Sequence, residues 1–86
     1  MNVSRGTVID EKSLIDCLQK NCIKGAALDV FLNEPTINPT FKKLSNVILH
    51  PHGGSATLET RTAMAQLSLD NLKSFFKTGN PLHSVI

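Results

Sequence analysis

One histidine in this sequence stands in a setting that could support chemistry. His52 comes after a short apolar run, Val47–Leu49, and directly after Pro51, and it is followed by Gly53 and Gly54. An imidazole can give or take a proton near neutral pH, and glycines let a ligand approach the backbone closely. Most histidines in loops have no catalytic role. His52 therefore becomes a candidate acid or base only if other functional side chains gather near it.

Three charged side chains follow the two apolar segments that precede Val47–Leu49. Arg5 ends the first segment, and Asp29 and Glu34 lie at and just beyond the end of the second. Each has an ordinary explanation, as a solvated cation, a capping acid or a loop acid. A carboxylate in an apolar strand is costly without a partner, so Asp29 either hydrogen-bonds local backbone or faces a ligand. A guanidinium, a carboxylate and an imidazole at one place would suit acid–base chemistry on a small anion.

The residue pattern predicts the elements that would position these side chains. The residues from Gly25 to Leu28 are small or apolar without alternation, which is typical of a strand buried on both faces. Asp10 is a good N-cap for a helix that ends near Asn21, with Lys12 and Asp16 expected to pair on its polar face. The predicted order is strand 1–4, helix 10–21, strand 25–31, an irregular link 32–45 with one helical turn opening at Pro39, strand 46–49 and a long helix 57–77.

The long helix carries an apolar stripe that predicts burial against a core. Its members recur at spacings of three and four residues: Ala65, Leu69, Leu72 and Phe76, widened by Met64, Leu67 and Phe75.

Crossovers between apolar strands predict an α/β fold with a parallel sheet and flanking helices. In open sheets of this kind, ligands bind beyond the carboxyl ends of the strands. Arg5, Asp29 with Glu34, and His52 all follow such ends, so the topology is expected to bring them to one edge of the sheet.

Composition narrows the possible functions. With 86 residues the chain forms at most one small domain, and a net charge of +2 without Tyr or Trp argues against nucleic-acid binding. No apolar run reaches the ~20 residues of a membrane span, and the N-terminus has no apolar signal region. Cys17 and Cys22 do not have the spacing of a zinc site, which predicts two free, partly buried thiols in the cytoplasm. His50 and His52 lack a third ligand nearby, so no metal site is predicted.

Three spaced blocks resemble the signature of a known family. Asn2–Gly6, Gly25–Phe31 with Glu34–Pro35, and Pro51–Thr57 are similar, in this order, to the D-isomer-specific 2-hydroxyacid dehydrogenases. The stretch Gly54–Arg61 looks most like the glyoxylate, hydroxypyruvate and 2-ketogluconate reductase branch. The resemblance implies a partial Rossmann-like parallel sheet, the C-terminal part of a doubly wound nucleotide-binding domain, with residues 1–86 as a single partial domain.

The resemblance also implies a catalytic role for three residues. Arg5 would bind the carboxylate and keto oxygen of a 2-oxo acid such as glyoxylate or hydroxypyruvate, because its fork of donors suits a planar anion. His52 would protonate the carbonyl oxygen as hydride arrives, and would act as the base in reverse. Glu34 would pair with His52, orient it and stabilise the imidazolium.

The cofactor implied by the resemblance is NAD or NADP. Asp29 would bind the nicotinamide carboxamide, Ser4 and Gly54 would lie along the cofactor, and Arg5 and His52 would border it. The Gly-x-Gly-x-x-Gly turn that holds the pyrophosphate does not occur in residues 1–86. His50 and Gly53 stand where the family more often has threonine or leucine, and a bulkier apolar residue.

The missing turn predicts that the chain is the C-terminal quarter to third of such an enzyme and is inactive alone. The complete enzyme is expected to be a homodimer that binds neither nucleic acid nor membrane. The piece would need the remaining segments or would self-associate. A different interpretation also stands: a non-catalytic remnant, or an interaction module that uses the sheet edge and Phe75–Phe76. The choice of 2-oxo acid and the choice between NAD and NADP lie outside what these residues encode.

Overall fold

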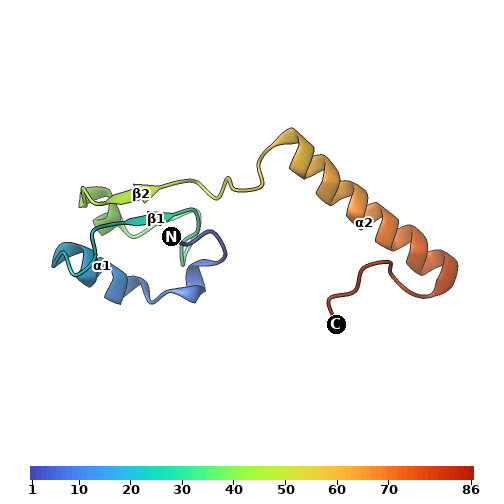
Figure 1. The fold of residues 1–86 in the computed structure, drawn as a ribbon, viewed down its shortest axis with the longest axis horizontal. Helices are drawn as coiled ribbons and strands as arrows, with labels where there is room; N and C mark the ends of the chain where they lie inside the picture. Colours follow the sequence, from blue (N-terminus) through green and yellow to red (C-terminus); the bar gives the residue numbers. More distant parts are fainter. The chain divides into compact units, whose positions relative to one another are not determined.

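The computed structural model describes all 86 residues, which form two compact units, Met1–Gly54 and Ser55–Ile86. The elements, shown in Figure 1, are the 3-10 helix η1 (Gly6–Val8), helix α1 (Glu11–Gln19), strand β1 (Ala26–Leu28), the 3-10 helix η2 (Pro39–Lys43), strand β2 (Val47–Leu49) and helix α2 (Leu58–Thr78). The prediction that both units belong to one partial domain stays a prediction.

The first unit contains a small parallel sheet. Strands β1 and β2 pair in parallel with Leu28 opposite Leu49, and Asn2 forms a parallel bridge to Leu28 on the other side of β1. The predicted α/β fold with a parallel sheet is confirmed. Since the three segments run the same way, the residues that follow them come to the same edge of the sheet.

The predicted strand 1–4 is reduced to the single pairing residue Asn2. Its side-chain oxygen accepts hydrogen bonds from the backbone nitrogen and the hydroxyl of Ser4, and its amide donates to the carbonyl of Arg5 at 2.9 Å. A side chain that binds the backbone of the next residues competes with ladder pairing. The chain therefore turns away from β1 directly after Asn2.

The core of this unit lies between α1 and the sheet. Asp10 caps α1 by accepting from the backbone nitrogens of Lys12 and Ser13, and Asn21 ends it in the left-handed conformation with φ 54°, both as predicted. One face of α1 is buried against the strands and η2. The core residues are Ile15, Leu18, Leu28, Phe31 and Phe41.

Three local predictions about this unit are wrong. The strand predicted at Gly25–Leu28 is not buried on both faces, because Leu28 is buried while Ala26 and Ala27 are only half-buried. Asp16 pairs with Lys20 at 2.8 Å rather than with Lys12. Both cysteines are free, but Cys22 is exposed and only Cys17 is partly buried.

The second unit is helix α2 with the segment that follows it. Thr57 caps the helix by accepting from the backbone nitrogen of Thr60, and Gly79 ends it with φ 80°, which confirms the predicted helix. The expected burial of its apolar stripe is not observed, since no residue of α2 is buried and Phe76 is 83% exposed. Within this unit only a short tail accompanies the helix, so no second layer covers the stripe. No helix of the chain is both long and apolar enough to cross a membrane.

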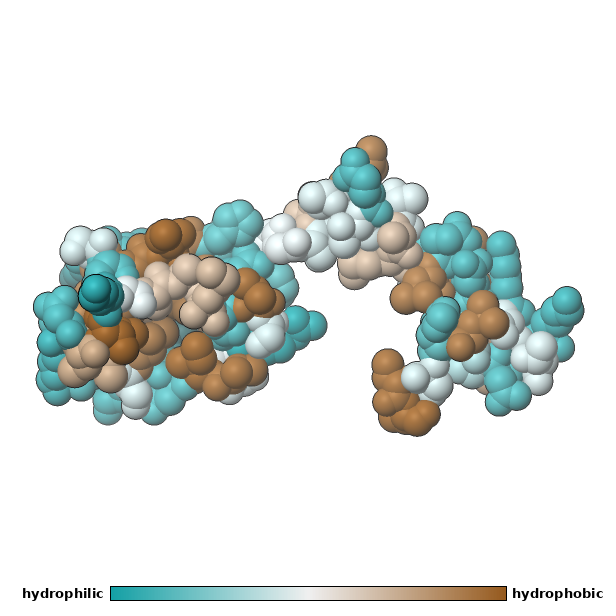
Figure 2. Space-filling model, in the orientation of Figure 1, coloured by the Kyte–Doolittle hydropathy of each residue, from teal (hydrophilic) through white to brown (hydrophobic).

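We expect the 86-residue chain to self-associate at micromolar concentration. Apolar side chains on α2 and on the sheet, among them Leu69, Leu72 and Ile48, are 44%, 55% and 70% exposed, and brown patches are visible on both units in Figure 2. Exposed apolar patches of this kind associate, and uncovered strand edges add to the tendency. Sedimentation velocity should show species larger than the monomer.

A charge-matched pair of variants locates the responsible surface. The double substitution Leu69→Glu and Leu72→Glu should shift the distribution toward monomer. Thr62→Glu with Gln66→Glu adds the same charge at exposed polar positions of α2 and should leave it unchanged. A sharp monomer with a cooperative thermal transition in the unmodified chain would contradict the expectation.

Candidate active site

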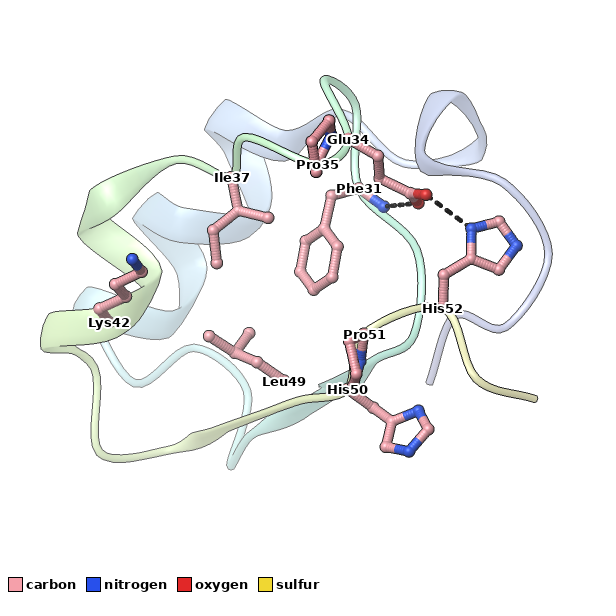
Figure 3. A pocket seen from close by; sticks show the side chains of 9 residues that line it. All are labelled: Phe31, Glu34, Pro35, Ile37, Lys42, Leu49, His50, Pro51 and His52. Atoms are coloured by element: carbon pink, nitrogen blue, oxygen red, sulfur yellow. Dashed lines mark hydrogen bonds and ion pairs between the residues drawn. The ribbon is translucent and has the colours of Figure 1, made fainter. Parts of the chain in front are cut away.

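The structure pairs His52 with Glu34. The imidazole Nδ1 of His52 lies 2.6 Å from Oε2 of Glu34, although the residues are 18 positions apart. Glu34 is itself anchored, because its Oε1 accepts from the backbone nitrogen of buried Phe31 at 2.9 Å. Figure 3 shows both interactions at the mouth of a pocket. The predicted contact between these two site residues is therefore present.

The backbone holds His52 in an unusual conformation. His50 continues the sheet by donating its backbone N–H to the carbonyl of Leu28 at 2.8 Å, and the N–H of His52 turns back to the carbonyl of His50 at 3.0 Å. His52 has φ 52°, which is uncommon for a residue with a side chain. The turn that follows β2 thus directs the imidazole toward the loop that carries Glu34.

Electrostatics determine which imidazole nitrogen is available. The hydrogen bond from His52, together with that from the backbone of Phe31, holds the pKa of Glu34 below its ordinary value. The ionised carboxylate can only accept, so Nδ1 of His52 carries the proton of the shared bond. Nε2 is left as the nitrogen that can exchange a proton with a substrate.

Asp29 is a buried carboxylate at the end of β1, with 7% of its surface exposed. Its Oδ1 accepts from Nδ1 of His50 at 2.6 Å and from the backbone nitrogen of Gly53 at 2.8 Å, and its Oδ2 accepts from the backbone nitrogen of Gly54 at 3.0 Å. These bonds, above all that from His50, lower the pKa of Asp29. Of the two possibilities open from the sequence, binding of local backbone is observed.

Arg5 and Ser4 directly precede Gly6, which contacts the segment between β1 and Glu34. Gly6 rests directly on the backbone of Phe31 and Leu32, where even a Cβ would overlap the carbonyl of Phe31. The guanidinium of Arg5 donates to the carbonyl of Ser4 at 2.6 Å and makes no hydrogen bond to Glu34 or His52. The structure therefore brings Arg5 to the edge of the sheet but does not join it to the pair.

A pocket of about 360 Å³ adjoins Glu34 and His52. Its walls include Phe31, Ile37 and Leu49, with Lys42 at the far side from His52 (Figure 3). Apolar walls that exclude water strengthen the electrostatic interactions of groups at their rim.

Sequence reasoning did not name His50 and Gly53 as site residues, yet both contact Asp29. The contact between His50 and Asp29 follows from the register of the parallel strands. Because Leu28 of β1 lies opposite Leu49 of β2, the residues that follow them, Asp29 and His50, must be neighbours. The contact of Gly53 depends on the turn and has no such signal.

Comparisons with known proteins agree with this geometry. Residues 1–54 match the family described as D-isomer specific 2-hydroxyacid dehydrogenase, NAD binding domain. The chain is 52% identical over its full 86 residues to a 2-ketogluconate reductase of Gluconobacter oxydans, of which it covers 28%. It is 51% identical over 75 residues, 87% of its length, to 22% of a glyoxylate reductase of Pyrococcus furiosus.

A solved structure shares the fold. The NADPH-dependent glyoxylate/hydroxypyruvate reductase of Sinorhizobium meliloti, in complex with NADP and malonate, superimposes with a TM-score of 0.93 at 48% identity, over 98% of this chain and 26% of that one. The chain thus spans about a quarter of the length of the relatives it matches. With the family match over residues 1–54, these likenesses show that the chain belongs to the D-isomer-specific 2-hydroxyacid dehydrogenases.

Proposed function

We propose that this chain supplies the acid–base residues of an NAD(P)-dependent oxidoreductase that interconverts 2-oxo acids and D-2-hydroxy acids. The observation that carries the proposal is the 2.6 Å contact between His52 and Glu34. An imidazole oriented by a carboxylate through one nitrogen, with the other nitrogen free, is the arrangement of a general acid and base. The relatives named glyoxylate and 2-ketogluconate reductase support the substrate class.

His52, in this proposal, moves the proton of the reaction. In reduction it arrives protonated on both nitrogens and gives the Nε2 proton to the carbonyl oxygen; in oxidation the neutral ring takes the hydroxyl proton. Glu34 keeps Nδ1 protonated and offsets the charge of the imidazolium. Arg5 binds the carboxylate of the substrate, which requires its exposed guanidinium to release the carbonyl of Ser4.

Reduced NAD or NADP, when bound, would supply the hydride for reduction, and the oxidised form would accept it in the reverse direction. Asp29 fits the nicotinamide carboxamide as an acceptor, because its Oδ2 accepts one hydrogen bond in the structure, from Gly54, and a carboxylate oxygen has a second lone pair. Gly54 fits beside it, since a Cβ there would lie 2.9 Å from that oxygen. Ser4, at the same edge of the sheet, would line the cofactor. The family described as an NAD-binding domain and the relative that binds NADP support either dinucleotide.

Two further parts of the proposal concern the parent protein. The exposed apolar face of α2 supports a homodimer. Two free cysteines support a cytoplasmic location.

A chimeric enzyme tests the function. We would replace the segment of the Sinorhizobium meliloti reductase that aligns with this chain, 26% of that protein, with residues 1–86. The chimera should reduce glyoxylate or hydroxypyruvate with NADPH. The 86-residue chain alone should not, because it lacks the glycine-rich turn at a helix N-terminus that holds a pyrophosphate.

Thermal unfolding and NADPH binding of the chimera serve as controls for folding. A chimera that folds and binds NADPH but reduces neither substrate contradicts the proposal and favours the non-catalytic interpretation. Turnover by the isolated chain, after contaminating reductases are removed, would contradict the second expectation.

A further inference from the structure

One buried carboxylate ties together both sides of the turn that carries His52. Asp29 binds the side chain of His50, two residues before His52, and the backbone nitrogens of Gly53 and Gly54 directly after it. The three donors lie within 2.6–3.0 Å of its two oxygens. A residue with a side chain keeps a positive φ only where its surroundings hold it there, and the ties to Asp29 flank that residue.

The ring of His50 fills the space in which a side chain at position 53 would lie. Gly53 has no positive φ, so its backbone conformation does not itself require glycine. A Cβ on Gly53 would lie 2.5 Å from Cε1 and 3.2 Å from Nδ1 of the His50 ring. The ring that donates to Asp29 therefore stands where a side chain at position 53 would otherwise begin.

The ring of His50 is held by these contacts rather than by burial. Its side chain is 60% exposed, whereas that of Asp29 is 9% exposed. A side chain at position 53 would push the ring of His50 outward into solvent, and the ring would then lose its hydrogen bond to Asp29. The imidazole at position 50 and the absence of a side chain at position 53 thus depend on each other.

We propose that His50 is a positioning residue for His52, acting through Asp29, and that it requires glycine at position 53, so that positions 50 and 53 work as one unit. The unit holds the Pro51–Gly54 turn, and with it the approach of His52 to Glu34. Its effect on catalysis rests on the proposed function, whereas the unit itself does not.

Hydrogen–deuterium exchange of the 86-residue chain tests the unit without any activity. The amides of Gly53 and Gly54 report the ties to Asp29, because exchange requires the turn to open. His50→Thr and Gly53→Ala should each raise their exchange rates roughly tenfold, the effect of losing one hydrogen bond to a charged group. The double variant should also show roughly tenfold and not a hundredfold, since both changes break the same bond.

A conservative variant separates a positioning role from general loosening. His50→Asn places an amide donor near the position of Nδ1 and should keep exchange near that of the unmodified chain. Multiplicative effects in the double variant, or no effect of Gly53→Ala, would overturn the coupling. Exchange in the unmodified chain as fast as in an unstructured peptide would overturn the tie itself.

The catalytic consequence is read in the chimera. His50→Thr should lower kcat several-fold, and His50→Asn should restore it. Unchanged kcat in a chimera whose exchange shows the open turn would overturn the positioning role. A chimera without any turnover would count against the proposed function, while the exchange data still decide whether the unit exists.

Discussion

Replacing His52 with asparagine in the chimeric reductase should lower kcat/KM for glyoxylate reduction by roughly 10²- to 10⁴-fold, the usual contribution of a positioned acid or base. Asparagine is chosen because it tolerates the positive φ of 52° at this position better than most residues. It cannot transfer a proton. Reduction and oxidation should lose activity together, because the same nitrogen acts in both directions.

The control is His83→Asn, which changes another exposed histidine that lies outside the site. It should leave kcat/KM unchanged. NADPH binding and thermal unfolding of the His52→Asn variant should match those of the parent chimera. A loss of less than about tenfold, with the fold intact, would remove His52 from the role of general acid and base.

Glu34→Gln should have the second largest effect, a fall in kcat/KM for reduction of roughly 10- to 100-fold, in the range expected for losing a hydrogen bond to a charged group. Glutamine keeps the shape and can still accept from the backbone nitrogen of Phe31, but it no longer stabilises an imidazolium. Reduction uses the protonated ring and should therefore lose more activity in the variant than oxidation, which uses the neutral ring.

The acid side of the profile follows from the carboxylate itself. The hydrogen bond from His52 holds the pKa of Glu34 below its ordinary 4.5. The stabilisation of the pair is therefore complete above that value and is lost as the pH falls through the lower pKa of the folded protein. Parent and variant should differ most near neutral pH and converge in strong acid.

Steady-state kinetics in both directions across the pH range decide this prediction. A glutamate that is only a loop acid predicts identical profiles for parent and Glu34→Gln. If the profiles coincide while His52→Asn still abolishes turnover, the carboxylate does not assist the imidazole. The contact between them would then serve only to shape the loop.

Much of the local structure follows from the sequence alone, because it depends on short-range chemistry. Asp10 and Thr57 cap the two α-helices, and Gly79 supplies the left-handed residue that ends α2. The unbroken small and apolar run at Gly25–Leu28 predicted a strand with parallel neighbours. Parallel strands bring their carboxyl ends together, so the sequence also predicted that Glu34 and His52 would lie at one edge of the sheet. Their pairing was implied by the family resemblance.

Burial could not be predicted in the same way, because it depends on what covers each face. An apolar stripe shows which side of a helix would be buried, but not whether a partner layer is present. In this chain Ile48 and the stripe of α2 remain exposed. The strand at residues 1–4 was overestimated for a related reason, since the side chain of Asn2 competes with the ladder.

The sequence by itself determined the family, the parallel sheet and the residues that could perform acid–base chemistry, because each of these resides in residue types and their order. Only the tertiary structure decided how those residues are held. It joined Asp29 to His50, Gly53 and Gly54, and it left the guanidinium of Arg5 apart from the pair. Such contacts form only when segments far apart in the chain are placed to within a few tenths of an ångström, and no local pattern encodes that placement.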